Sequence, residues 1–154
     1  MSDLTENELK VFIDAVLHYF AQMSTYKPEI RTSYLAQEGA PSYDYTGLIS
    51  ISGHYRGCVY FTAPRLMLRQ LLIEMREPDT TEANLLDAIG EMANTIAGNA
   101  RRYFGEALEI SVPVTFKGVA EHLRAAVRAR PFVMIVAWSG YEAAVVVDIE
   151  STNK

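Results

Sequence analysis

Cysteine and net positive charge are both scarce in this 154-residue chain. The single cysteine, Cys58, allows neither an intrachain disulfide nor a cysteine-rich zinc site, so we expect a protein of a reducing, cytoplasmic compartment. Lysine and arginine total 14 against 19 acidic residues, a formal charge of -5 that disfavours nucleic acid as a partner. The longest apolar run, residues 131–138, is far short of the roughly 20 residues that span a bilayer, so we expect no membrane insertion.

Histidine is also sparse and scattered. His18, His54 and His122 fall in separate predicted elements without the spacing of a two-histidine helical motif, so we expect no metal site and no bound cofactor. Cys58 lies in an apolar strand pattern with no neighbouring cation to lower its pKa, which favours a small core side chain over a nucleophile.

The composition that remains is that of an ordinary folded domain. Hydrophobic residues make up 49% and charged residues 21% of the chain, so we predict one domain over residues 1–154. Periodicity predicts helices at about residues 5–23, 64–77 and 79–104. Alternating or β-branched patterns predict strands at 29–36, 45–52, 58–62, 108–116, 123–130, 132–138 and 143–149.

This order of elements indicates an α+β fold with a mostly antiparallel sheet and helices packed on one face. The strands at 132–138 and 143–149 are apolar at nearly every position instead of alternating, which indicates burial on both faces. A second subunit is one way to provide that cover.

The long helix at 79–104 has two distinct faces. At about 100° per residue, one narrow stripe is apolar and is predicted to face the core: Leu85, Ile89, Met92, Ile96 and Tyr103. The opposite arc carries a line of residues spaced by four, three and four, here called the outer ridge: Asp87, Glu91, Asn94 and Gly98. Gly90 lies at its edge.

The outer ridge has two interpretations. Acids and amides on the outer face of an amphipathic helix are most often solvated surface, and periodicity alone names no function. A carboxylate and a carboxamide stacked together, however, can pair with a cation and both donate and accept hydrogen bonds. Gly98, which costs the helix about 1 kcal/mol relative to alanine, indicates close approach of another surface.

Residues 87–99, with the sequence DAIGEMANTIAGN, resemble the signature helix of the CheC, CheX and FliY phosphatases of bacterial chemotaxis. That signature is Asp or Ser, three residues, Glu, two residues, Asn, and Asp87, Glu91 and Asn94 fill it. Residues 112–115, VPVT, resemble the proline-containing strand that follows in the family. CheC-type members usually carry the signature twice, whereas this chain carries it once, as in the CheX branch.

The resemblance implies a CheC-like fold, a homodimer joined through the sheet, and hydrolysis of the aspartyl phosphate on a CheY-like receiver domain. In that role Asn94 orients the attacking water and Glu91 pairs with the receiver's lysine, while Asp87 and Gly98 contact the partner. The Mg²⁺ is expected from the receiver, not from this chain. Two other classes stay open: a non-catalytic module that binds a receiver or flagellar-switch component, and a sensor with a small-ligand pocket between helix and sheet.

Overall fold

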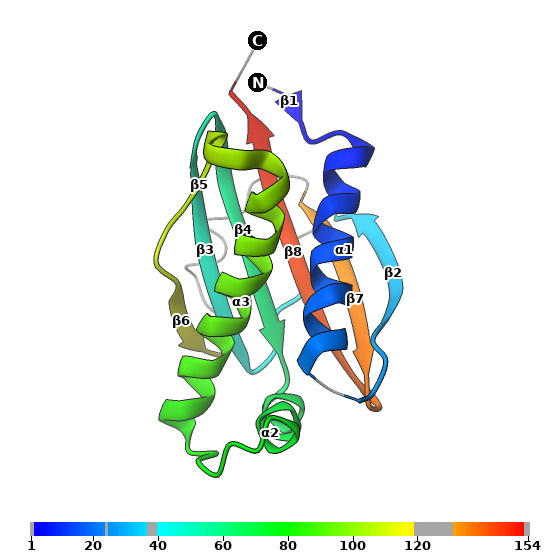
Figure 1. Ribbon diagram of the computed structural model, residues 1–154, viewed down its shortest axis with the longest axis vertical. Helices are drawn as coiled ribbons and strands as arrows, with labels where there is room; N and C mark the ends of the chain where they lie inside the picture. Colours follow the sequence, from blue (N-terminus) through cyan, green and yellow to red (C-terminus); the bar gives the residue numbers. More distant parts are fainter. Residues whose placement is uncertain (1, 24, 37–39, 119–130, 153–154) are drawn as a thin grey trace.

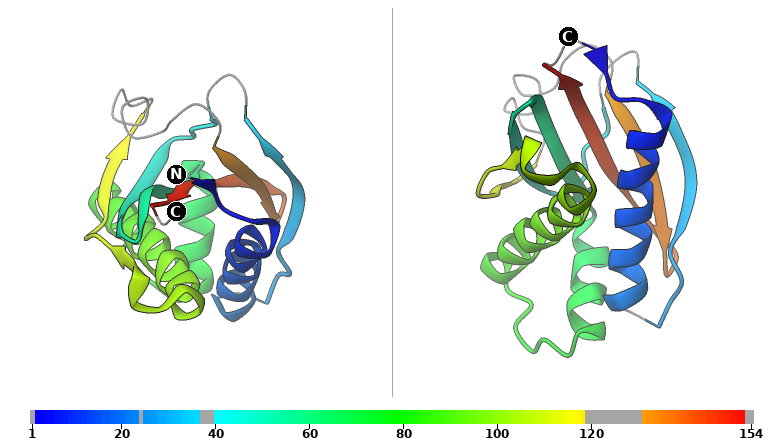
Figure 2. Two further views of the ribbon diagram at one scale, coloured as in Figure 1. Left: turned by 90° about the horizontal axis from the view of Figure 1, so that it is seen from above. Right: turned by 45° about the horizontal axis from the view of Figure 1, so that its top comes forward.

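The computed structural model describes residues 2–23, 25–36, 40–118 and 131–152. Three helices, α1 (Glu6–Met23), α2 (Arg65–Glu74) and α3 (Glu82–Phe104), lie on one face of an antiparallel sheet. Helices α1 and α3 lie side by side, and α2 crosses one end of the layer (Figure 1). The sheet curves over the two long helices (Figure 2). The predicted α+β fold is confirmed.

Each long helix begins at a threonine cap. The Thr5 hydroxyl accepts a hydrogen bond from the Glu8 amide, and the Glu8 carboxylate accepts one from the Thr5 amide, which is a capping box at the start of α1. Thr81 caps α3 through the amide of Asn84, and Gly105 ends that helix with φ of 73°. The predicted start of this helix at Asp79 is wrong, because the Asp79 carboxylate accepts a hydrogen bond from the Thr81 amide just before the helix.

Within the described residues the main path of the sheet is β2-β7-β8-β4-β3-β5. Strands β3 (Tyr45–Gly53) and β4 (Tyr55–Ala63) form the predicted hairpin, and β7 (Phe132–Trp138) pairs with β8 (Tyr141–Ser151) through a turn at Ser139 and Gly140. Strand β2 (Glu29–Leu35) forms one edge. The short β1 (Ser2–Asp3), which pairs with the end of β8, was not predicted.

The strand predicted at 108–116 is two strands. Strand β5 (Leu108–Ile110) pairs with the end of β3, and β6 (Val114–Lys117) pairs with its beginning. Pro113 lies in the gap, where its missing N–H removes no ladder hydrogen bond. The strand predicted at 123–130 lies outside the described residues.

Burial on both faces of the central strands is confirmed within a single chain. In β8, Ala143, Val145 and Val147 belong to the large core under the helices, while Ala144 and Val146 belong to a second apolar cluster on the opposite face. The second cluster also contains Leu48, Cys58, Tyr60 and Val133, with Ala40, Tyr43, Phe116 and Ile135 packed against it. Cys58 is therefore a buried core side chain.

The predicted core stripe of α3 is right except at its end. Leu85, Ile89, Met92 and Ile96 are at most 1% exposed, but Tyr103 is 63% exposed. The core position in the last turn is taken by Phe104, whose ring lies 5.7 Å from that of Phe12 and 5.1 Å from that of Tyr55. The buried stripe thus rotates around the helix because α3 crosses the curved sheet at an angle instead of following one strand (Figure 1).

Candidate functional site

The outer ridge of α3 faces away from the sheet, as predicted. Asp87 and Glu91 are exposed, Asn94 and Gly98 are partly exposed, and the residues between them, Met92, Ala93, Ile96 and Ala97, are buried. Glu91 and Asn94 are three residues apart, so their side chains leave the helix about 60° apart and about 4.5 Å apart along its axis. One partner surface can contact both at once.

The functional groups of the ridge form no hydrogen bond or ion pair with the part of the chain that the structure describes. Among the described residues the side chains of Asp87, Glu91 and Asn94 make no hydrogen bond or ion pair, whereas the Thr95 hydroxyl donates to the backbone carbonyl of Glu91 at 2.8 Å. A side chain whose hydrogen-bonding groups are exposed and unmatched is available for an intermolecular partner. This is the arrangement that a docking or catalytic surface requires.

Glu91 lies beside the seam between α3 and α1. Burial, and next to it the negative charge of Glu91, raise the pKa of Tyr19 above its ordinary value of 10.0, because both disfavour the phenolate. Tyr19, on α1, is 6% exposed and packs edge-on against Phe20. Tyr19, on a helix that is distant from α3 in sequence, therefore lies within electrostatic range of Glu91.

Gly90, at the edge of the outer ridge, is where α3 packs against Pro113 and Thr115. A Cβ placed at Gly90 would lie 2.8 Å from Cγ2 of Thr115 and 3.6 Å from Cβ of Pro113, so the helix backbone packs directly on the segment that leads into β6. The Gly90 glycine is needed for that contact. The first turn of α3 is fixed to the same strand, since Glu82 accepts hydrogen bonds from Lys117 and from the Tyr45 hydroxyl.

Gly98 differs from Gly90. A Cβ placed at Gly98 would have no heavy atom within 4 Å apart from the helix's own backbone and adjoining residues. No packing within the described part of the chain requires a glycine there, although glycine weakens a helix interior by roughly 0.8–1 kcal/mol. Packing among the described residues therefore does not account for this glycine.

One further residue, Arg102, extends the line of the outer ridge and is not part of the family signature. Arg102 follows Gly98 by four residues and therefore continues the same line, and its side chain is exposed. The spacing is visible in the sequence, but the family pattern ends at the asparagine and gives no reason to single out Arg102.

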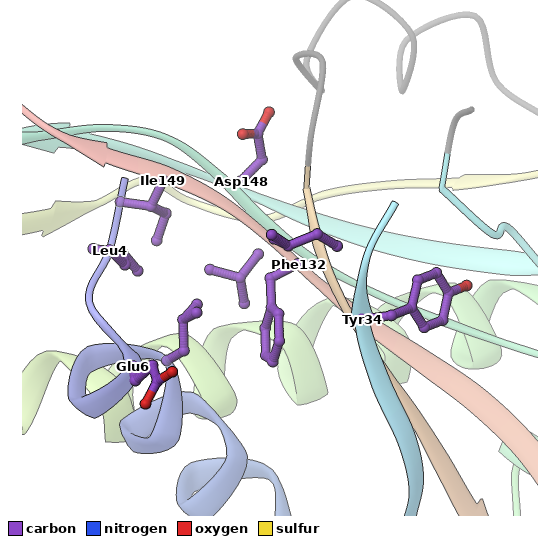
Figure 3. Close-up of a pocket in the computed structure, with 9 residues that line it drawn as sticks. Leu4, Glu6, Tyr34, Phe132, Asp148 and Ile149 are labelled. Atoms are coloured by element: carbon purple, nitrogen blue, oxygen red, sulfur yellow. The ribbon is translucent and has the colours of Figure 1, made fainter. Parts of the chain in front are cut away.

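A separate cavity of about 450 Å³ opens between the start of α1 and the sheet. Figure 3 shows Leu4, Glu6, Phe132 and Ile149 around this space, while the Asp148 carboxylate points to the other side of β8. Its walls are mainly apolar, and none of the lining residues comes from α3. With few convergent polar groups to orient a ligand, it does not favour the sensor alternative over the ridge.

Metal-ligating side chains do not gather in the described part of the chain. Residues 2–23, 25–36, 40–118 and 131–152 contain no group of three or more His, Cys, Asp or Glu side chains placed to hold a metal ion. In the same residues no helix is both long and apolar enough to cross a membrane.

The fold and the ridge together define an α+β protein that presents a carboxylate and a carboxamide from one exposed helix face. The family described as chemotaxis phosphatase CheX matches residues 45–137, which is more than half of the chain and includes all of α3. The chain belongs to this CheX family. No curated protein sequence matches it at a significant level.

Solved structures share the fold at low sequence identity. The chemotaxis protein CheX from Vibrio vulnificus is 18% identical with a TM-score of 0.78, over 94% of this chain and 99% of that one. A CheC-like superfamily protein from Shewanella sp. PV-4 is 17% identical with a TM-score of 0.81, over 96% and 100%. CheX from Borrelia burgdorferi, solved as a complex with CheY, BeF3 and Mg, is 13% identical with a TM-score of 0.74, over 94% and 98%.

Proposed function

We propose that this chain hydrolyses the aspartyl phosphate of a CheY-like receiver domain, with α3 as the surface that docks on the phosphorylation site. Membership of the CheX family and the fold shared with a CheX that was crystallised with CheY support the proposal. The observation that carries it is the pair Glu91, which is exposed, and Asn94, which is partly exposed, one turn apart on the outer ridge and without a hydrogen bond or ion pair to the described residues.

In this reaction the main task of the phosphatase is to position the attacking water. In phosphoryl transfer a water oxygen attacks phosphorus in line with the leaving oxygen, and the charge is neutralised by a metal and a cation. A receiver supplies Mg²⁺ and a lysine at its own phosphoaspartate, so the bond that breaks is already polarised. The water's oxygen becomes part of inorganic phosphate, its proton leaves with that phosphate or to solvent, and the aspartate carboxylate is regenerated.

Asn94 is proposed to place that water. Its carboxamide oxygen accepts a hydrogen bond from the water while its NH₂ group donates to a phosphoryl oxygen, so one side chain fixes both reactants. A neutral amide suits this role because it does not repel the phosphoryl group. Holding a reactant in line is among the larger contributions that positioning makes to rate.

Glu91 is proposed to pair with the receiver's lysine. A charge-assisted hydrogen bond of this kind is short and directional, so it fixes the angle at which α3 approaches. The contacts at the sides of the helix, at Gly90 and at Glu82, keep the ridge in one position relative to the sheet. Asp87 and Gly98, at either end, are proposed to contact the receiver without taking part in the chemistry.

The homodimer implied by the resemblance stays a prediction. The edge strand β2 exposes 42% of Tyr34 and 49% of Leu35, and it is a surface through which two sheets would pair.

The test is the loss of phosphate from a phosphorylated receiver in the presence of Mg²⁺. Asn94→Ala should reduce the acceleration by on the order of 10² to 10³, as expected for loss of one transition-state donor, with an unchanged unfolding transition. Asn99→Ala is the matched control, because Asn99 lies on the same helix about 140° around from Asn94. Wild-type turnover by Asn94→Ala would remove Asn94 from the mechanism. Receiver binding without any acceleration by the wild type would make the chain a non-catalytic module instead.

A further inference from the structure

The outer ridge and Arg102 together carry charges of opposite sign at their two ends. The ridge begins with two acids, Asp87 and Glu91, and Arg102 follows its last residue, Gly98, by four positions. By helical geometry the Arg102 side chain leaves α3 about 20° around from that of Glu91, so both project from the same face. Between the two charges lie the neutral Asn94 and the bare Gly98.

The exposed side chain of Arg102 makes no hydrogen bond or ion pair with the described residues. The neighbouring Arg101 differs, because its Nε donates a hydrogen bond to the carbonyl oxygen of Leu108 at 2.9 Å and ties the end of α3 to β5. Both Arg101 and Arg102 lie in the last turn of α3, where a cation interacts favourably with the helix dipole.

We propose that Arg102 pairs with a carboxylate of the receiver, on the side of the phosphorylation site opposite to the lysine that Glu91 contacts. This inference rests on the proposed function, because it assigns the orientation of the same docked partner. When a ridge carries charges of opposite sign at its two ends, a partner with the complementary charges is attracted in one orientation. The same partner is repelled when it is turned end to end. Arg102 is thus a specificity-determining residue that selects direction and register.

The distances fit a single interface. Arg102 lies eight residues beyond Asn94, which is about 12 Å along the helix axis. A standard interface covers roughly 800 Å² on each partner and is therefore about 30 Å across. With Asn94 at the phosphorylation site in its centre, Arg102 falls inside the edge of the interface. Gly98, with open space beside it, lets the receiver reach the helix between the two charges.

The test measures binding, so that it does not depend on turnover. A CheY-like receiver from the same organism, activated with beryllofluoride and Mg²⁺, is titrated calorimetrically into the wild type and into Arg102→Ala, Arg102→Lys and Arg102→Glu, at low and high salt. The matched control is Arg69→Ala, which removes the same charge from an exposed position on α2.

Arg102→Ala should weaken binding about two- to fivefold, which is the range for one exposed ion pair, and Arg102→Glu should weaken it about tenfold or more. Arg102→Lys should retain most of the affinity, Arg69→Ala all of it, and the salt dependence should be shallower in Arg102→Ala than in the wild type. Equal affinity of wild type and Arg102→Ala, or equal losses in Arg102→Ala and Arg69→Ala, would overturn the inference alone. A wild type that binds no receiver would overturn the proposed function as well.

Discussion

Gly98→Ala should improve the fold and impair the function. Because a Cβ at this position meets no neighbouring atom, the added methyl group creates no clash within the chain. Alanine is favoured over glycine in a helix interior by about 0.8–1 kcal/mol. We therefore expect the free energy of unfolding to rise by about that amount, which in a chain of this size is roughly 2–4 °C in the unfolding midpoint.

The same methyl group should obstruct the receiver. If the partner's surface contacts the helix at Gly98, a methyl group inserted into that contact acts like an overpacked core position, at about 1–3 kcal/mol. We expect the dissociation constant for an activated receiver, and the KM for dephosphorylation, to rise on the order of tenfold. Urea unfolding followed by circular dichroism and a receiver titration measure the two effects on one sample.

Gly90→Ala is the control that separates these effects. Its methyl group would meet Cγ2 of Thr115, a β-branched side chain with little freedom at χ1, so the gain in helix propensity is offset by a clash. Gly90→Ala should therefore be less stable than Gly98→Ala. If Gly98→Ala stabilises the protein and binds the receiver as well as the wild type does, close approach is not the reason for this glycine. If it destabilises the protein, the space beside Gly98 is not open.

Two further outcomes concern the acids of α3. Glu91→Ala should weaken receiver binding about tenfold or more, because a hydrogen bond to a charged group contributes about 1.5–3 kcal/mol; unchanged affinity by calorimetry would contradict the pairing with a lysine. In the first turn of α3, a hydrogen bond from Lys117 and, to a smaller extent, one from the Tyr45 hydroxyl hold the pKa of Glu82 below its ordinary value of 4.5. A carboxyl with a lowered pKa stabilises the fold above about pH 4.5 and loses that contribution as pH falls through its folded pKa. Glu82→Gln should therefore flatten the decline of the urea midpoint below about pH 5, and a curve parallel to the wild type's would refute the assignment.

The sequence predicts α3 well because its amphipathic pattern is a local property. The spacing of Leu85, Ile89, Met92 and Ile96 identifies the buried face, and the exposed ridge follows by rotation about the helix axis. The pattern fails at Tyr103, where the buried direction is decided by Phe12 and Tyr55 of other elements. Periodicity assumes a straight and uniform surface beneath the helix, which a curved sheet does not provide.

Contacts between distant segments are the part of the site that the sequence does not reveal. The two glycines of α3 look alike in the sequence, and only the position of Thr115 and Pro113 shows that Gly90 serves internal packing while Gly98 does not. The approach of Tyr19 to Glu91 likewise depends on how α1 and α3 lie beside each other. The sequence pattern also fails to locate the break between β5 and β6 near Pro113 and the start of α3 at Glu82.

The packing of α3 at Gly90 bears on the proposed role of Asn94. In-line attack tolerates little error in the position of the water, and a side chain is only as well placed as the backbone that carries it. Asn94 lies one turn beyond Gly90, so the packing of that backbone on Pro113 and Thr115 fixes the turn from which the carboxamide projects. Under the proposed function, Gly90 and the proline-containing segment packed against it therefore help to position the Asn94 carboxamide. The VPVT segment of the family resemblance lies beside the outer ridge, although no side chain of it belongs to that ridge.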